Sequence, residues 1–207
     1  MRAYRTPVIV LLTRKWMLSH DDAEDMAHDF FARALEKDWF SKYDGERGRF
    51  RTFLRSCLFA FAADEHDRVH RRKRGGDAPH EPLTEQTSLP ATDNVIDTLF
   101  EEEWIRSVLQ LALDALRVEA EHANRAPAFA MFEEYDVQDN DGTDSKGRRT
   151  YAELALAWNV PTTQVTNYLS WARKRFRHHV LSTVRSLTGS DAEYREELRT
   201  LLGVVPE

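Results

Sequence analysis

The chain has 207 residues, of which 42% are hydrophobic and 31% are charged, and its formal net charge is −6. That length is enough for two compact domains. Eight glycines and seven prolines are too few turn-forming residues for an all-β fold. The single cysteine, Cys57, excludes a disulfide framework within the chain, and no apolar run is long enough for a signal peptide or a membrane span, so we expect a soluble all-α protein of the cytoplasm.

Hydrophobic periodicity predicts three helices in the first part of the chain. A short apolar helix over 8–16 precedes a helix over about 19–37, which Ser19 or Asp21 can cap. Asp-Gly and Arg-Gly turn signals follow, and a third helix is expected from about Arg49 to Arg74, where Gly75 and Gly76 end it. Its first half is apolar and its second half is basic, so we expect the first half to pack and the second half to project. These helices form a first domain over 1–76.

The second part of the chain is separated by a predicted linker over 77–94, which carries three prolines and no periodicity. A helix is expected from Val95 to about Leu116, a short helix over 128–135 and an exposed loop over 136–149. A second domain would thus occupy 95–187. Residues 188–207 form a helical tail with a capping-box signal at Ser190 and Glu193, and we expect it to dock on the second domain.

Residues 150–178 have the pattern of a helix-turn-helix. Tyr151, Leu154, Ala155 and Trp158 are spaced as one narrow apolar helix face, and Pro161 interrupts the pattern before a second amphipathic helix. The polar face of that second helix starts with short side chains suited to base edges in the major groove: Thr162, Thr163, Gln164, Thr166, Asn167 and Ser170. A basic run suited to phosphates follows: Arg173, Lys174, Arg175 and Arg177. The plainer interpretation is an amphipathic helical hairpin with a solvated basic end; we favour DNA binding.

The segments DDAEDMAHDFFARALEK and YDGERGRFRTFLRSCLFAFAADEHDRVHRRKRGG closely resemble region 2 of extracytoplasmic-function sigma factors of the sigma-70 family. The helix-turn-helix is similar to region 4 of the same family, and the resemblance covers nearly the whole chain in the right order. His28 stands where the family usually has Gln. The resemblance implies a transcription-initiation subunit that binds core RNA polymerase and recognises and melts promoter DNA, with region 4 at the −35 element and region 2 at the −10 element.

Further site residues follow from that resemblance. The family's region 2 helix packs on the clamp helices of the largest polymerase subunit, which maps to the polar side of the second helix: Asp25, His28, Asp29 and Arg33. Region 4 would meet the flap of the second-largest subunit. Region 2 captures a base flipped out of the promoter, and aromatic and basic groups that could do so lie between and after the turn signals: Trp39, Phe40, Tyr43, Arg47 and Arg49. The duplex just upstream would meet the basic helix end: Arg68, Arg71, Arg72 and Arg74. An anti-sigma protein is a further partner that the family allows.

Two other function classes remain open. The first is a stand-alone helix-turn-helix regulator with a helical effector domain, and the second is a helical interaction protein such as a co-sigma or anti-sigma partner. The sequence contains no recognisable set of catalytic residues that would support an enzyme. His66 and His70 have the spacing of a ligand pair but no further partners, and residues 137–148 fail the calcium-loop pattern at both ends. We therefore expect no catalytic residues, metal, cofactor or small-molecule substrate.

Overall fold

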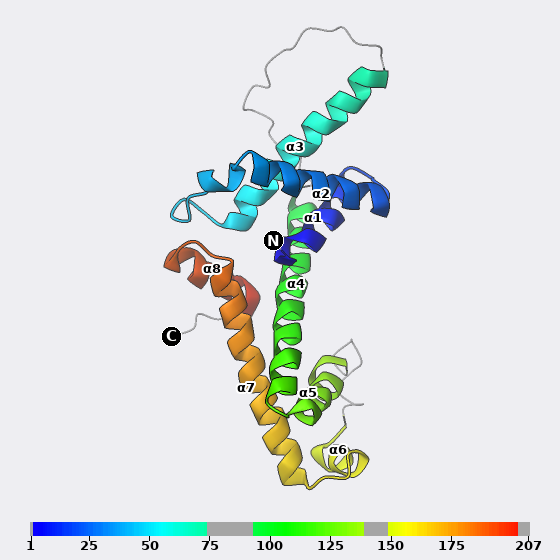
Figure 1. Cartoon of the computed structure of the whole chain (residues 1–207), viewed down its shortest axis with the longest axis vertical. Coiled ribbons are helices and arrows are strands. Elements are labelled where there is room, and N and C mark those ends of the chain that lie inside the picture. Colours follow the sequence, from blue (N-terminus) through cyan, green and yellow to red (C-terminus); the bar gives the residue numbers. More distant parts are fainter. Residues whose placement is uncertain (1, 74–92, 139–148, 203–207) are drawn as a thin grey trace. The chain divides into compact units, whose positions relative to one another are not determined.

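A computed structural model describes residues 2–73, 93–138 and 149–202 (Figure 1). Its elements in chain order are α1 Arg2–Lys15, α2 His20–Glu36, the 3₁₀ turn η1 Trp39–Lys42, α3 Phe50–Lys73, α4 Asp93–His122, α5 Ala126–Phe132, the π turn η2 Glu133–Val137, α6 Tyr151–Ala157, α7 Thr162–Ser186 and α8 Asp191–Leu202. Within these ranges there is no strand, which confirms the all-α prediction for the described residues. In the same ranges no helix combines the length and the apolarity that crossing a bilayer requires.

Contacts between Cα atoms divide the chain into two units. The first comprises residues 1–107 together with 187–207, and the second comprises 108–186, so the division falls inside α4. The predicted linker lies almost wholly outside the described residues, and the domain boundaries drawn around it remain a prediction. The grouping of the first part of α4 and of α8 with the N-terminal helices was not foreseen.

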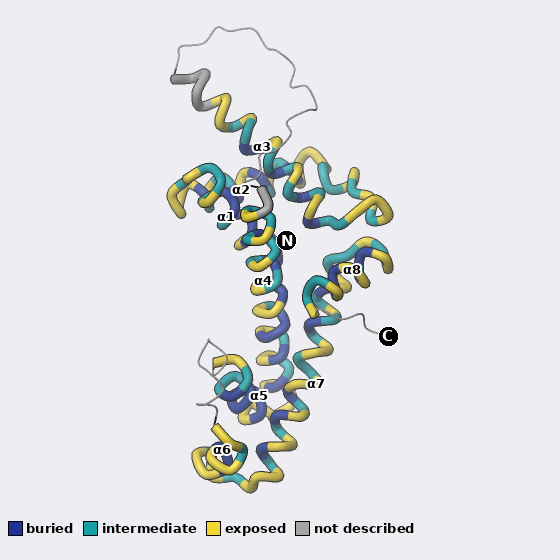
Figure 2. Tube along the Cα trace, turned by 180° about the vertical axis from the view of Figure 1, so that it is seen from behind, coloured by how far each residue is buried: buried dark blue, intermediate teal, exposed yellow. Residues whose placement is uncertain are grey.

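The core of the first unit is built from the apolar faces of α1, α2 and α3. Ser19 caps α2, because its Oγ accepts from the Asp22 N–H at 3.1 Å, and small residues on the buried face of α2 let α1 pack closely against it. The fully covered positions follow helical spacing (Figure 2): Ala23, Ala27, Phe30 and Ala34 on α2, and Leu54, Leu58, Phe61 and Ala62 on α3. α1 begins at Arg2, earlier than expected, because Pro7 lies inside the helix instead of marking its start.

The second unit packs the later part of α4 with α5, α6 and α7 around one hydrophobic cluster. The buried side of α7 carries Val165, Leu169, Ala172, Val180 and Val184. α4 runs for 30 residues to His122, beyond the predicted end at Leu116, since Leu116 and Ala120 both lie in this core. The cluster fixes the orientation of α7 and therefore decides which of its side chains face solvent.

The tail helix α8 packs in the first unit. Ser190 caps it, with Oγ accepting from the Glu193 N–H at 3.1 Å, and Leu198 is 1% exposed. The expectation that the tail docks on the second domain is wrong for the contacts described, because its partners are Gly45, Arg49, Phe50 and Arg51. These partners are polar groups of α3 and of the loop before it, and sequence periodicity carries no information about them.

Candidate nucleic-acid interface

A short turn over residues 158–161 joins α6 to α7, where the sequence predicts a helix-turn-helix. α6 starts with a capping box between Thr150 and Glu153, and it ends in a Schellman motif. The Val160 N–H donates to the Ala155 carbonyl at 3.0 Å, the Asn159 N–H donates to the Leu156 carbonyl at 3.2 Å, and Asn159 has a φ of 51°. Val160 packs on the hydrophobic cluster, so the turn is tied to the core and α7 leaves it in a defined direction.

One side of α7 is exposed and polar from its first turn. The predicted base-reading residues lie together there: Thr162, Thr163, Thr166, Asn167 and Ser170 are exposed, and Gln164 is half-buried. Lys174 and Arg177 continue the stripe; both are exposed, and neither forms an ion pair with another described residue. The helix therefore offers neutral hydrogen-bonding groups first and exposed cations after them, the order that a recognition helix needs.

Arg173 and Arg175 have partners within the second unit. Arg173 makes a bidentate contact with Asp136 at 2.7 and 2.9 Å and donates to the Tyr151 hydroxyl at 2.9 Å. The hydrogen bonds that Arg173 donates to Asp136 raise the pKa of this arginine above its usual value. Arg175 forms an ion pair with Glu119 at 2.7 Å, and this contact holds the pKa of Glu119 below its usual value. Both arginines connect α7 to its own domain, and their predicted contacts with phosphate would have to compete with these carboxylates.

The predicted polymerase-facing residues share the outer side of α2. Asp25, His28 and Asp29 are exposed, opposite the buried alanines and Phe30. Arg33 is half-buried, pairs with Glu65 at 3.0 Å and lies over the Phe61 ring at 5.1 Å from its centroid. Three of the four side chains are therefore available to a partner, whereas Arg33 contacts α3.

The aromatic residues before α3 are half-buried and contact aromatic rings of α2 and α3. Trp39 lies 6.2 Å from Phe30, Phe40 lies 5.5 Å from Phe50, and Tyr43 lies 5.1 Å from Phe50 between ring centroids. Burial, together with the neighbouring Glu193, raises the pKa of the Tyr43 phenol, whose hydroxyl donates to the Gly48 carbonyl at 3.0 Å. These rings stabilise the loop, and the prediction that they stack on a flipped base remains a prediction.

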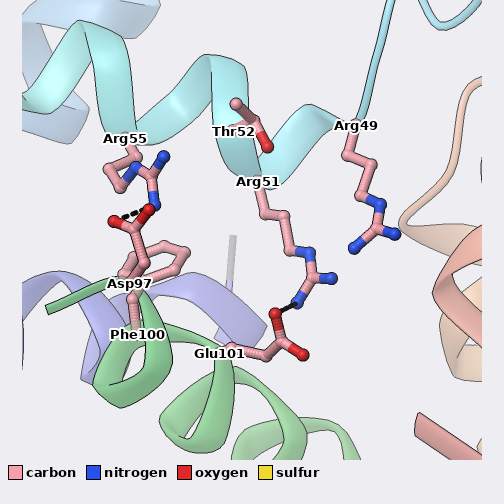
Figure 3. A pocket seen from close by; sticks show the side chains of 7 residues that line it. All are labelled: Arg49, Arg51, Thr52, Arg55, Asp97, Phe100 and Glu101. Atoms are coloured by element: carbon pink, nitrogen blue, oxygen red, sulfur yellow. Dashed lines mark ion pairs between the residues drawn. The ribbon is translucent and has the colours of Figure 1, made fainter. Parts of the chain in front are cut away.

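Cationic side chains gather where α3 begins (Figure 3). Arg51 and Arg55 point toward α4, where they pair with Glu101 and Asp97, beside a pocket of about 180 Å³ that also has Arg49, Thr52 and Phe100 in its lining. Arg51 is 5% exposed and also pairs with the buried Glu197 at 3.1 Å. Arg49 pairs with Glu196 at 2.5 Å. Arg49 was predicted from the sequence, whereas Arg51 and its two carboxylate partners were not.

Two of the remaining predicted cations, Arg47 and Arg68, have carboxylate partners. Arg47 is exposed and pairs with Asp44 at 3.1 Å, and Arg68 is exposed and pairs with Glu65 at 2.8 Å. Arg71 and Arg72 belong to α3, but their side chains lie outside the described part of the structure, as does all of Arg74. Within the described ranges, no group of three or more His, Cys, Asp or Glu residues is arranged to hold a metal ion.

Most of the residues around Arg49 and Arg51 that sequence patterns did not assign to the candidate interface are carboxylates. Glu193, Glu196 and Glu197 recur at i, i+3 and i+4, a spacing that places them on one side of a helix and could have been recognised. Their partners at the start of α3 are 143 to 147 positions away along the chain, and no local signal indicates such pairings. Comparisons with protein-family models, with curated proteins and with solved structures found no match for this chain.

Proposed function

We propose that this protein is a sigma factor of the extracytoplasmic-function type, which binds core RNA polymerase and directs it to promoters. The observation that carries the proposal is the exposed stripe of α7, which starts directly after a helix-turn-helix turn. Its neutral side chains, among them Thr166 and Asn167, suit base edges, and Lys174 and Arg177 suit phosphates.

Polymerase binding is the part of the proposal that separates a sigma factor from other DNA-binding proteins. The exposed outer side of α2 supports it, since Asp25, His28 and Asp29 are directed away from the core. The test is run-off transcription with purified core polymerase from the source organism and a library of genomic promoters, with and without this protein. Transcripts that share two upstream elements are expected only when the protein is present.

A matched pair of charge reversals tests the proposed polymerase surface. Asp29→Arg is expected to abolish co-elution with core polymerase, because it reverses the charge at the centre of the exposed side of α2. Glu121→Arg reverses an exposed charge on α4 and should leave co-elution intact. If both variants co-elute as the wild type does, the polymerase surface is elsewhere or does not exist.

A second pair of variants tests base recognition by α7. Asn167→Ala should lower the yield of specific transcripts in a promoter-dependent way, since one good base contact contributes about 1–3 kcal/mol of discrimination. Ser182→Ala removes an exposed hydroxyl four turns further along the same helix and should have no effect. Equal transcription by both variants from every promoter would rule out base reading at Asn167.

A stand-alone DNA-binding regulator is the second candidate. The observation in its favour is the packing of Trp39, Phe40 and Tyr43 against rings of α2 and α3, because an aromatic base-binding loop is what distinguishes a sigma factor from a repressor. Tight binding of the protein alone, as a dimer, to a palindromic duplex, together with no binding to core polymerase, would establish this second candidate.

A further inference from the structure

The acidic side of α8 lies against the start of α3 in the first unit. One oxygen of the Glu193 carboxylate accepts from the Phe50 N–H at 2.6 Å and the other accepts from the Gly189 N–H at 2.6 Å. Glu196 pairs with Arg49 at 2.5 Å, and Arg49 also donates to the Thr200 hydroxyl at 3.2 Å. Three consecutive residues at the N-terminal end of α3, Arg49, Phe50 and Arg51, are thus engaged by one short helix.

The groups that α8 engages are those that bind phosphates in other proteins. The N–H groups at the start of a helix carry partial positive charge and accept anions, and arginine is the preferred partner for phosphate oxygens. Here the Glu193 carboxylate accepts the hydrogen bond from the N-terminus of α3. Glu196 and Glu197 form ion pairs with Arg49 and Arg51, respectively. Each carboxylate is therefore in a position that a sugar-phosphate backbone could take.

The contact also covers the loop before α3. The Ser190 hydroxyl donates to the Gly45 carbonyl at 3.0 Å, and the backbones of Gly45 and Gly189 touch. A Cβ atom at Gly45 would lie 3.2 Å from the Gly189 carbonyl carbon and 3.3 Å from the Ser190 nitrogen. Only a glycine permits this approach without a shift of the backbone, so residue 45 controls how closely α8 sits on the loop.

We propose that α8 is an internal competitor of nucleic acid: its glutamates cover Arg49, Arg51 and the start of α3 until single-stranded promoter DNA displaces them. The inference rests on the proposed function, because the covered surface includes Arg49, which the family resemblance assigns to the melted promoter. It adds a regulatory step to that function, since DNA must exchange with α8 before the arginines can contact phosphates.

The composition of the contact favours exchange over permanent docking. α8 contributes a single fully buried apolar side chain, Leu198, and its glutamates contact Arg49, Phe50 and Arg51 through ion pairs and hydrogen bonds. Replacing carboxylates by phosphates keeps the arginine charges paired, so the exchange avoids the cost of an isolated buried cation. Glu197 is 2% exposed, and one of its oxygens has no hydrogen-bond partner among the described residues, which makes the docked state costly at that position.

Two glycines of the same loop provide a matched test. Gly45→Ala should push α8 away, whereas a Cβ at Gly48 would meet nothing within 4 Å, so that Gly48→Ala is the control. The affinity of each full-length variant for a fluorescein-labelled, mixed-sequence single-stranded DNA is measured by anisotropy. Gly45→Ala is expected to bind more tightly than the wild type and Gly48→Ala to bind equally. Thermal denaturation of both variants shows whether they are folded.

A second pair of variants tests the same competition without touching the backbone. Glu196→Gln removes the ion pair with Arg49 and should raise the affinity for the same DNA roughly two- to fivefold, the effect of one partly exposed pair. Glu36→Gln removes an equal charge at an exposed position of α2 and controls for the change in net charge. If Gly45→Ala and Glu196→Gln bind the DNA no more tightly than their controls, or none of the proteins binds it, the competition does not occur.

Hydrogen exchange reports on the displacement itself. Saturating single-stranded DNA should speed amide exchange in α8 and slow it at the start of α3; unchanged or slower exchange in α8 would overturn the proposal. The outcome is separable from the proposed function, because neither measurement contains polymerase. If the wild type supports transcription but α8 does not respond to DNA, the competition is ruled out and the sigma assignment stands. If α8 competes with DNA but the protein does not bind polymerase, the sigma assignment is ruled out and the competition stands.

Discussion

Arg51 and Glu197 form a buried pair that is costly to disrupt at either end. Their side chains are 5% and 2% exposed, their charged atoms lie 3.1 Å apart, and Arg51 also lies over the Trp104 ring at 5.0 Å from its centroid. Such a pair contributes little net free energy compared with apolar side chains of the same size, but removal of one partner leaves an uncompensated charge. The two residues therefore behave as a unit.

Substitution of one or both partners tests this. Arg51→Ala is expected to lower the free energy of unfolding by about 3 kcal/mol, because Glu197 would remain buried without its cation. The double variant Arg51→Met with Glu197→Leu should recover most of that loss. Urea denaturation followed by circular dichroism measures both; a double variant as unstable as the single one would show that the pair itself is strongly stabilising.

The protonation of Glu197 links the stability of the first unit to pH. Burial raises the pKa of this carboxyl to about 7 from an ordinary value of 4.5, in spite of Arg51 and Arg49, and Glu193 and Glu196 add to the increase. The folded state thus retains a proton that the unfolded state releases. The resulting stabilisation is complete below the unfolded pKa of 4.5 and is lost as the pH rises through about 7.

A pH series should make this visible. Between about pH 5 and about pH 8 the free energy of unfolding should fall by on the order of 2 kcal/mol through this group, and the fall should be smaller in Glu197→Gln, which cannot titrate. The measurement is urea denaturation of both proteins at each pH. Parallel curves for the two proteins would mean that Glu197 titrates near its ordinary value.

At the scale of elements, the turn from α6 to α7 depends on one residue in the left-handed region. Asn159 has a φ of 51°, and asparagine tolerates this conformation better than a β-branched residue does. Asn159→Val should therefore lower the free energy of unfolding by about 1–2 kcal/mol, while Asn159→Gly should leave it equal or raise it slightly. Thermal denaturation compares them; equal losses in both variants would indicate that the asparagine side chain itself is required.

The cations of α7 should divide into two functional groups. Lys174→Ala and Arg177→Ala are each expected to reduce the salt dependence of DNA binding by about one unit of slope without loss of stability. Arg173→Ala should instead destabilise the second unit by about 2 kcal/mol, because its bidentate contact with Asp136 holds η2 against α7. Salt titrations of DNA affinity and urea denaturation of the three variants test this division. If Arg173→Ala is as stable as the wild type and its DNA affinity depends less on salt, Arg173 contacts DNA after all.

Local chemistry explains which features the sequence could predict. The cap at Ser19, the break at Pro161 and the apolar faces of α2 and α7 depend on residues within a few positions of one another, so periodicity and capping rules found them. The partners of Arg173 and Arg175 are 37 and 56 positions away and depend on which helix faces meet. Those arginines were consequently assigned to DNA, although the fold supplies each with a carboxylate.

At the scale of the whole molecule, the acidic excess is used within the structure. The chain has 35 acidic and 29 basic residues, and many of the cations near the candidate interface have a carboxylate partner: Arg33, Arg47, Arg49, Arg68, Arg173 and Arg175. A negative net charge does not exclude a DNA partner, because binding depends on the cations that remain available. It does predict that non-specific attraction to duplex DNA is weak.

A salt titration of the intact protein measures how many cations are available. If Lys174 and Arg177 are the principal contacts, the logarithm of the affinity for mixed-sequence duplex DNA should fall against the logarithm of salt with a slope of about −2. Fluorescence anisotropy in the absence of polymerase is sufficient. A much steeper slope would mean that further cations, such as those at the end of α3, contact phosphates as well.

The contact between Glu193 and the Phe50 N–H has a consequence for synthesis of the protein. The two residues are 143 positions apart, so the ribosome completes the first unit's earlier helices well before it adds the carboxylate that caps α3. At ordinary elongation rates that interval is on the order of ten seconds. During this time the nascent chain exposes the loop, the arginines and the uncapped start of α3. A chaperone or a nucleic acid can therefore bind this surface without competition from α8 until translation reaches that helix.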